Sequence, residues 1–176
     1  MMLLARDAGQ TIRAALLALF VVAGLAGIGV VLWSLRPTPG YASEAVQAGS
    51  PFDVTFEVQN ESPWFALANL RIYCVLIHVR GSSMPPAIVE AADVRLAGTL
   101  SGGLAPGDGG TFSCPLRTVV DHPAAEDASI AQRAEIYFRS EYDEPVAGAF
   151  RITDNSPPFV LNTRLLPPRW TKKAQP

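Results

Sequence analysis

The feature that most constrains this chain is an uncharged apolar stretch near its N-terminus, from Ala14 to Trp33, which reads AALLALFVVAGLAGIGVVLW. A helix of this length rises about 1.5 Å per residue and is roughly 30 Å long, which matches the hydrocarbon core of a bilayer. In a soluble fold, a helix that is apolar on every face would need protein all around it. We therefore expect a transmembrane helix over residues 14–35, preceded by a cytoplasmic stub of residues 1–13.

The alternative interpretation of the stretch is a cleaved signal peptide. The apolar region of a signal peptide usually has about 7–15 residues and ends near a small-residue cleavage site. This stretch is longer, and the nearest small residues that suit cleavage, Ala42 and Ala45, lie well beyond its end. The sequence therefore favours an anchor that is retained.

The cations that flank the stretch predict its orientation. Arg6 and Arg13 precede it together with the amino terminus, whereas only Arg36 follows it closely. Because positive charge collects on the cytoplasmic side, we expect a cytoplasmic N-terminus and a C-terminal domain on the far side of the membrane. For a bacterial protein this is a single-pass inner-membrane topology with a periplasmic domain.

Several small residues within the apolar stretch suggest a partner helix. Ala23 and Gly27 are four residues apart, and Gly24 lies beside them. Small residues at this spacing let two helices approach closely, although they also occur in spans that stand alone. We expect these three residues to be the helix-packing positions.

The segment after the span is expected to be a connector of residues 36–49. Pro37 and Pro39 end the helix and stiffen the chain. Trp33 and Tyr41 flank the outer end of the span, where aromatic residues commonly lie at the membrane interface.

The rest of the chain alternates apolar and polar residues in short runs separated by Gly, Pro and Asn turns, a pattern typical of half-buried strands. The expected strands lie within 50–60, 67–80, 92–101, 112–116, 135–142, 146–153 and 159–165. Such a series predicts an all-β fold, an antiparallel immunoglobulin-like β-sandwich over residues 50–166, with a closed barrel as the alternative. Residues 167–176 are expected to be a basic C-terminal tail.

Two short motifs carry a resemblance to a known family. The chain reads F-x-V-x-N from Phe56 to Asn60 and L-x-P-G from Leu104 to Gly107, followed by Thr111 and Phe112. This outline resembles the immunoglobulin-like modules of the CARDB type. The resemblance implies a β-sandwich, and a role in adhesion or assembly such as these modules have in cell-surface and periplasmic proteins.

The two cysteines, Cys74 and Cys114, both fall in strand-like runs. An oxidising compartment outside the cytoplasm would permit a disulfide between them. Two unlinked buried thiols are the alternative. Two cysteines at this separation do not form a zinc cluster of the CxxC type.

The charge of the body argues against nucleic-acid binding. Between Pro37 and Thr163 there are 7 Arg and no Lys against 15 Asp plus Glu, a net charge of −8. Nucleic-acid binding normally needs a basic face. The C-terminal segment from Arg164 onward carries four cations, too few to change this conclusion.

The sequence shows no catalytic signature, and we expect neither an enzyme nor a bound cofactor or metal. It contains no GxSxG motif, and the glycine-rich turn from Gly102 to Gly110 lacks the lysine and helix of a phosphate-binding loop. His78, His122 and Met84 could bind copper together with the cysteines, because copper favours imidazole and soft sulfur ligands. This leaves a tethered copper carrier and a secreted or surface hydrolase as alternatives.

Together these features predict an accessory or assembly subunit of a membrane protein complex. Such a chain has membrane lipid and other subunits as partners and acts through protein contacts. The expected contact surfaces are the span and two aromatic side chains, Trp64 and Trp170, with a position in the core as the alternative for either tryptophan.

Overall fold

The computed structural model of the chain describes residues 2–47, 49–83, 85–98, 100–120, 122–146 and 148–174, with side chains from Arg13 onward. The chain forms two compact units, Met1–Arg36 and Pro37–Pro176. The first unit is one helix, α1 (Met2–Ser34), and the second is a β domain. Helix α1 begins well before the apolar stretch, so the segment expected as a stub continues the helix.

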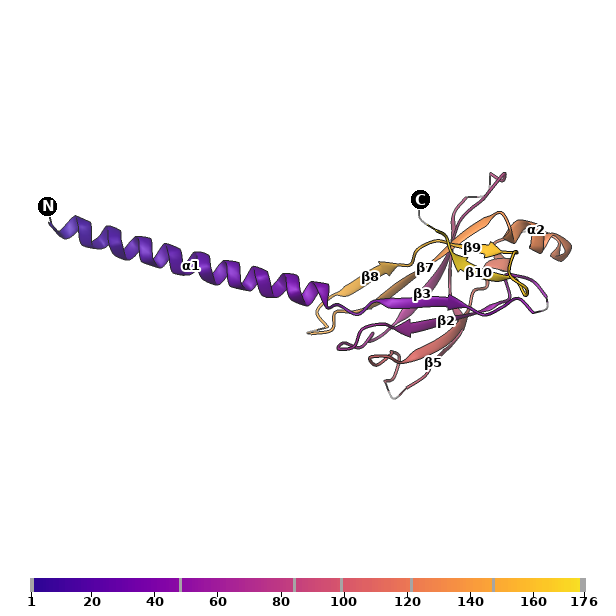
Figure 1. Cartoon of the computed structure of the whole chain (residues 1–176), viewed down its shortest axis with the longest axis horizontal. Helices are drawn as coiled ribbons and strands as arrows, with labels where there is room; N and C mark the ends of the chain where they lie inside the picture. Colours follow the sequence, from indigo (N-terminus) through magenta and orange to yellow (C-terminus); the bar gives the residue numbers. More distant parts are fainter. Residues whose placement is uncertain are drawn as a thin grey trace. The chain divides into compact units, whose positions relative to one another are not determined.

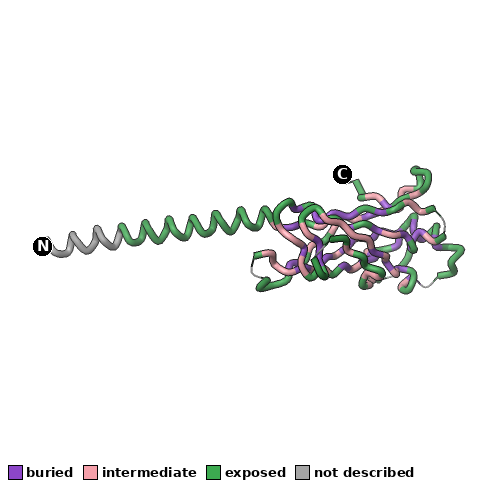
Figure 2. The backbone as a smooth tube through the Cα atoms, turned by 90° about the horizontal axis from the view of Figure 1, so that it is seen from below, coloured by how far each residue is buried: buried purple, intermediate pink, exposed green. Residues whose placement is uncertain are grey.

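Helix α1 has the surface of a membrane span. Its part from Arg13 to Ser34 has a mean hydropathy of 2.7 and buries none of its residues against the protein (Figure 2). By length and composition this helix can cross a bilayer. The expectation of one apolar N-terminal helix is therefore confirmed.

The β domain consists of two antiparallel sheets (Figure 1). Among the described residues, one sheet has the strand order β1-β2-β6-β5 and the other has the order β10-β9-β7-β3-β4, with β8 paired to β7. The strands are β1 (Pro39–Ser43), β2 (Thr55–Asn60), β3 (Arg71–Val79), β4 (Ala87–Glu90), β5 (Ala92–Leu96), β6 (Gly109–Ser113), β7 (Ala134–Asp143), β8 (Arg151–Asn155), β9 (Phe159–Asn162) and β10 (Arg169–Lys172). Between β6 and β7 lie two short 3-10 turns, η1 (Leu116–Thr118) and η2 (Ala124–Glu126), and one short helix, α2 (Asp127–Ala131).

This arrangement is that of a β-sandwich, and it confirms the predicted all-β domain. Strand β2, and β7 from Ile136 onward, alternate buried and less buried residues, as their sequences predict. Strand β3 lies between β7 and β4, and this central position suits its largely apolar run of residues.

An aromatic cluster joins the two sheets at the centre of the core. Phe138 of β7 lies with its ring centroid 4.8 Å from that of Phe56 of β2 and 5.3 Å from that of Phe112 of β6. Its ring also packs on Tyr41 of β1, at 4.9 Å between centroids. Because these rings come from both sheets, their burial holds the sheets together.

Two segments expected outside the domain are parts of its sheets. The expected connector, residues 36–49, contains β1, which pairs with β2 from Pro39 to Ser43. Tyr41 is therefore a core residue and lacks the exposure that an interfacial aromatic residue needs. The expected tail, residues 167–176, contains β10, which pairs with β9. Each segment has a single large aromatic residue, so neither displays the repeated alternation by which a strand is recognised.

Candidate functional site

The helix-packing positions lie open on α1. A methyl group added at Gly24 or Gly27 would meet no other described part of the protein, and Ala23 is exposed. Ala23 and Gly27 are one helical turn apart and share a face. This face is available to a second helix, and the predicted helix–helix contact remains a prediction.

The two tryptophans expected as partner contacts differ in exposure. Trp64 follows β2 and is 71% exposed, as a contact residue should be. Trp170 is 1% exposed and lies in the core, with its Nε1–H donating to the Pro51 carbonyl at 2.8 Å. For Trp170 the expected surface position is wrong and the alternative of a core position is confirmed, because β10 turns this side chain inward between exposed and less buried neighbours.

The end of the β domain at which the chain enters is built from three loops. The chain enters at the buried residue Pro37, whose carbonyl accepts a 2.6 Å hydrogen bond from the Tyr142 hydroxyl at the end of β7. The β2–β3 loop (61–70) is next to it, since the Glu61 N–H donates to the Thr38 carbonyl. The β5–β6 loop (97–108) and the β7–β8 loop (144–150) complete this end.

Hydrogen bonds tie the three loops to one another. Leu67 of the β2–β3 loop exchanges backbone hydrogen bonds with Leu104 of the β5–β6 loop, at 2.9 and 3.0 Å. The Asp143 N–H, where the β7–β8 loop begins, donates to the Ala68 carbonyl at 3.0 Å. The Asn60 side chain donates to the carbonyls of Phe65 and Leu104. The described parts of the three loops are therefore joined at one end of the domain.

This end of the domain exposes large apolar side chains from all three loops. They are Trp64 at 71%, Leu100 at 37%, Val146 at 64% and Phe150 at 54% exposed. We call these four residues the entry surface. Clustered exposed apolar residues commonly mark a surface that contacts a protein or a membrane.

The cysteines lie as the disulfide prediction requires. Cys74 of β3 and Cys114, just after β6, form a disulfide pair with their Cα atoms 5.8 Å apart. Both are buried, and their strands belong to different sheets. The pair therefore links the two layers of the sandwich.

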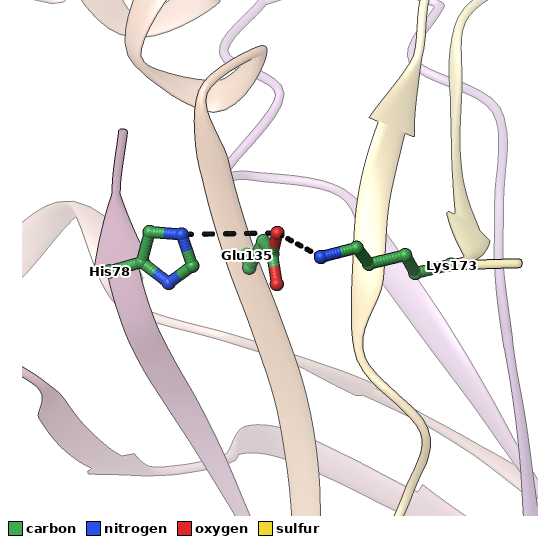
Figure 3. Close-up of polar contacts among 3 residues, drawn as sticks. All are labelled: His78, Glu135 and Lys173. Atoms are coloured by element: carbon green, nitrogen blue, oxygen red, sulfur yellow. Dashed lines mark hydrogen bonds and ion pairs between the residues drawn. The ribbon is translucent and has the colours of Figure 1, made fainter. Parts of the chain in front are cut away.

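A small polar cluster joins the C-terminal segment to the larger sheet (Figure 3). Glu135 of β7 is largely buried and accepts a 2.5 Å hydrogen bond from the Lys173 ammonium, while His78 Nε2 lies 3.9 Å from the same carboxylate oxygen. The hydrogen bond from Lys173 outweighs the effect of burial and holds the pKa of Glu135 below its usual range. An ionised carboxylate bound to a lysine fixes the end of β10, and we assign the cluster a structural role.

The residues considered for metal binding are not brought together. In the described part of the chain there is no group of three or more His, Cys, Asp or Glu side chains that could hold a metal ion. His78 contacts Glu135, and His122 is exposed near η2. Met84 lies outside the described residues, as does Asp121 beside His122. The copper-carrier alternative therefore has no ligand cluster here to support it.

Sequence reasoning missed three residues of the entry surface. Leu100 and Val146 were expected within strands, and Phe150 was expected in the same strand as Val146, yet all three lie in loops. For Val146 a signal exists in the pair of turns, Glu144-Pro145 and Gly148, that encloses it.

Comparison with known proteins gives no family for this chain. No protein-family model matches the sequence, and a search of curated proteins returns no match.

Proposed function

We propose that this chain is a single-pass membrane protein, anchored by α1, whose β-sandwich lies outside the cytoplasm and serves as an accessory subunit of a membrane protein complex. The N-terminus is cytoplasmic and the β domain periplasmic. The subunit acts through protein contacts made by the span and by the domain. It performs no chemistry of its own.

The observation that carries the proposal is how early the β domain begins. Strand β1 starts at Pro39, five residues after the last residue of α1, and its Tyr41 is 6% exposed within the aromatic core. Cleavage after Ala42 would remove Tyr41 from the domain, and cleavage after Ala45 would remove the whole of β1. A signal peptide that is cut there would take core residues with it. The fold thus supports an anchor that is retained.

The disulfide pair supports placing the domain outside the cytoplasm. Disulfides persist in oxidising compartments such as the periplasm and are rare in the cytosol. Cys74 and Cys114 are already positioned to form one. This agrees with the orientation that Arg6 and Arg13 predict on the cytoplasmic side of the span.

The open face of α1 supports an assembly role. In a bilayer the hydrophobic effect does not drive two apolar helices together, because lipid tails are as apolar as the helix side chains. Close association therefore depends on small residues that let the two backbones approach. Ala23, Gly24 and Gly27 provide such a surface, and nothing in the described protein covers it.

Two glycine substitutions in the same helix test this proposal. Gly27 lies on the face of Ala23, whereas Gly29 is two residues further and about 200° around the helix. Leucine at either position adds the same bulk, since a Cβ at each meets nothing within 4 Å. We expect Gly27→Leu to abolish recovery of partner subunits with the tagged full chain after mild detergent extraction, and Gly29→Leu to preserve it.

Two outcomes would contradict the proposal. Recovery of the wild-type chain as a lone monomer under every mild extraction condition would exclude a stable accessory subunit. Equal loss of partners in both leucine variants would show that the small-residue face is not the contact.

A further inference from the structure

We propose that the entry surface, formed by Trp64, Leu100, Val146 and Phe150, is seated in the lipid head-group layer of the membrane that α1 spans. This inference rests on the proposed function only in that α1 must cross a bilayer. It assigns the occupant of the surface as zwitterionic lipid.

The end of the β domain at which the chain enters, which we call the entry end, is kept close to the membrane by a short tether. Helix α1 ends at Ser34, and Pro37 is already buried in the β domain, with its carbonyl bound to Tyr142. Three residues of extended chain reach at most about 10 Å. The head-group region on each side of a bilayer is itself roughly 5–8 Å thick. The end of the domain that contains Pro37 therefore cannot move far from the lipid surface.

The entry surface is within reach of Pro37 through short stretches of chain. Glu61 bonds to Thr38, and Trp64 follows only three residues later. Tyr142 bonds to Pro37, and Val146 follows four residues later. Trp64 and Val146 thus lie within a few residues of the point at which the chain enters, and Phe150 is tied to the same loop through the hydrogen bond between the Glu144 N–H and its carbonyl.

Local hydrogen bonds hold these side chains in exposed positions. The Ser62 hydroxyl accepts hydrogen bonds from the backbone N–H groups of Trp64 and Phe65, at 3.3 and 3.1 Å. In the β7–β8 loop, the Glu144 carboxylate accepts the Val146 N–H at 2.7 Å, and the Glu144 N–H donates to the Phe150 carbonyl at 2.9 Å. The exposure of the apolar side chains is therefore a property of the folded loops.

The chemistry of the entry surface matches the interface of a bilayer. Tryptophan favours the head-group level, where its ring contacts apolar chains and its N–H meets polar groups. Phe150, Val146 and Leu100 add the apolar contact by which a surface inserts into the head-group boundary.

The charge of the entry end selects the type of lipid. Glu61, Asp108 and Glu144 belong to the same loops as the apolar residues. Three arginines border these loops: Arg36 precedes Pro37, Arg71 begins β3, and Arg151 begins β8 and donates to the Asn69 carbonyl. Because carboxylates and guanidinium groups occur together here, this end lacks the excess of basic side chains that attracts anionic head groups. We therefore expect the contact to form with zwitterionic lipid and to need no anionic component.

Tryptophan quenching by brominated lipid tests the inference on the full chain. In a Trp33→Phe variant, Trp64 and Trp170 are the remaining tryptophans, and Trp170 is buried in the core. A further Trp64→Phe change gives the emission of Trp170 alone as the baseline. The protein is reconstituted in phosphatidylcholine nanodiscs with or without lipids that are brominated near the head-group end of the acyl chains.

We expect brominated lipid to remove more than half of the Trp64 emission, with or without added anionic lipid. The matched control is Leu166→Trp in the Trp33→Phe, Trp64→Phe background. Leu166 is 92% exposed in the β9–β10 loop, at the opposite end, because β9 pairs with the start of β7 near Ile136. We expect its emission to be unaffected by brominated lipid and quenched by aqueous iodide. Phe150→Trp in the same background is a second reporter and should behave as Trp64 does.

Three results would overturn the inference. If Trp64 and Phe150→Trp are both quenched by iodide as strongly as Leu166→Trp and not by brominated lipid, the entry surface faces water. If Trp64 is shielded from both quenchers, a protein covers it. A chain that fails to integrate into the discs contradicts the anchor as well, which separates failure of the proposed function from failure of this inference alone.

Discussion

Replacing Trp170 tests whether the C-terminal strand is part of the core. Trp170 is 1% exposed, its ring centroid lies 6.1 Å from that of Phe52, and its Nε1–H donates to the Pro51 carbonyl. These contacts join the C-terminal segment to the residues that precede β2. Removing the indole therefore leaves a cavity and an unpaired buried carbonyl together.

The expected loss follows from the buried area. A buried tryptophan removes about 150–250 Å² from water, which at about 25 cal/mol per Å² corresponds to about 4–6 kcal/mol. Alanine retains a part of that burial, and we expect Trp170→Ala to lower the free energy of unfolding by about 3–5 kcal/mol. Trp170→Phe keeps most of the apolar contact but leaves the Pro51 carbonyl without its donor, at a cost of about 1–3 kcal/mol.

The assay is urea unfolding of the full chain in mild detergent, monitored by the far-ultraviolet circular dichroism signal of the strands. Trp64→Ala is the matched control, because the same change at a 71% exposed side chain should alter the free energy of unfolding by less than about 0.5 kcal/mol. Equal effects of Trp64→Ala and Trp170→Ala would refute the assignment of Trp170 to the core.

Three further predictions follow from the β domain. Replacing Cys74 and Cys114 by alanine should lower the free energy of unfolding in urea titrations by up to about 4 kcal/mol, since the disulfide closes a loop of 40 residues. Unchanged unfolding midpoints would contradict a formed disulfide. The lowered pKa of Glu135 contributes stability that is fully present above the ordinary pKa of 4.5 and is lost as the pH falls through the folded-state pKa. The urea unfolding midpoints of wild type and Glu135→Gln should therefore converge in acid. A difference between the two midpoints that stays constant to low pH would count against this role of Glu135. Gly103→Ala should cost about 1–3 kcal/mol in the same titration, because the added Cβ would clash with the Leu67 carbonyl oxygen, and a neutral effect would show that the loop relaxes.

The strands that could be predicted from the sequence are those with repeated alternation. In β2, Phe56 and Val58 point into the core between the outward residues Glu57 and Gln59, as the pattern indicates. Strands β1 and β10 were missed because each has one large buried aromatic residue, and a period of two needs several. Trp170 was misplaced because Arg169 and Lys172 beside it give the segment the composition of a solvated tail.

Trp64 is the one residue of the entry surface that the sequence predicted as a contact. The other three are exposed as a result of the fold, and only Val146, between two turns, has a local signal. Val146 and Phe150 have the composition of a strand, and the pairing of Asp143 with Arg151 leaves both in the hairpin loop. The Tyr142–Pro37 hydrogen bond that places this loop at the entry end joins residues 105 positions apart. Such a contact has no local signal in the sequence.

The most direct test of the account labels Leu166→Cys in the full chain, expressed in bacteria, with a membrane-impermeant maleimide. Leu166 is 92% exposed in the β domain, and the two native cysteines are paired with each other. If the anchor is retained and the domain is periplasmic, the maleimide labels the chain in intact spheroplasts. The labelled chain has its full mass and resists alkaline extraction from the membrane. Labelling only after lysis, or a released chain that begins near Ser43, would contradict it.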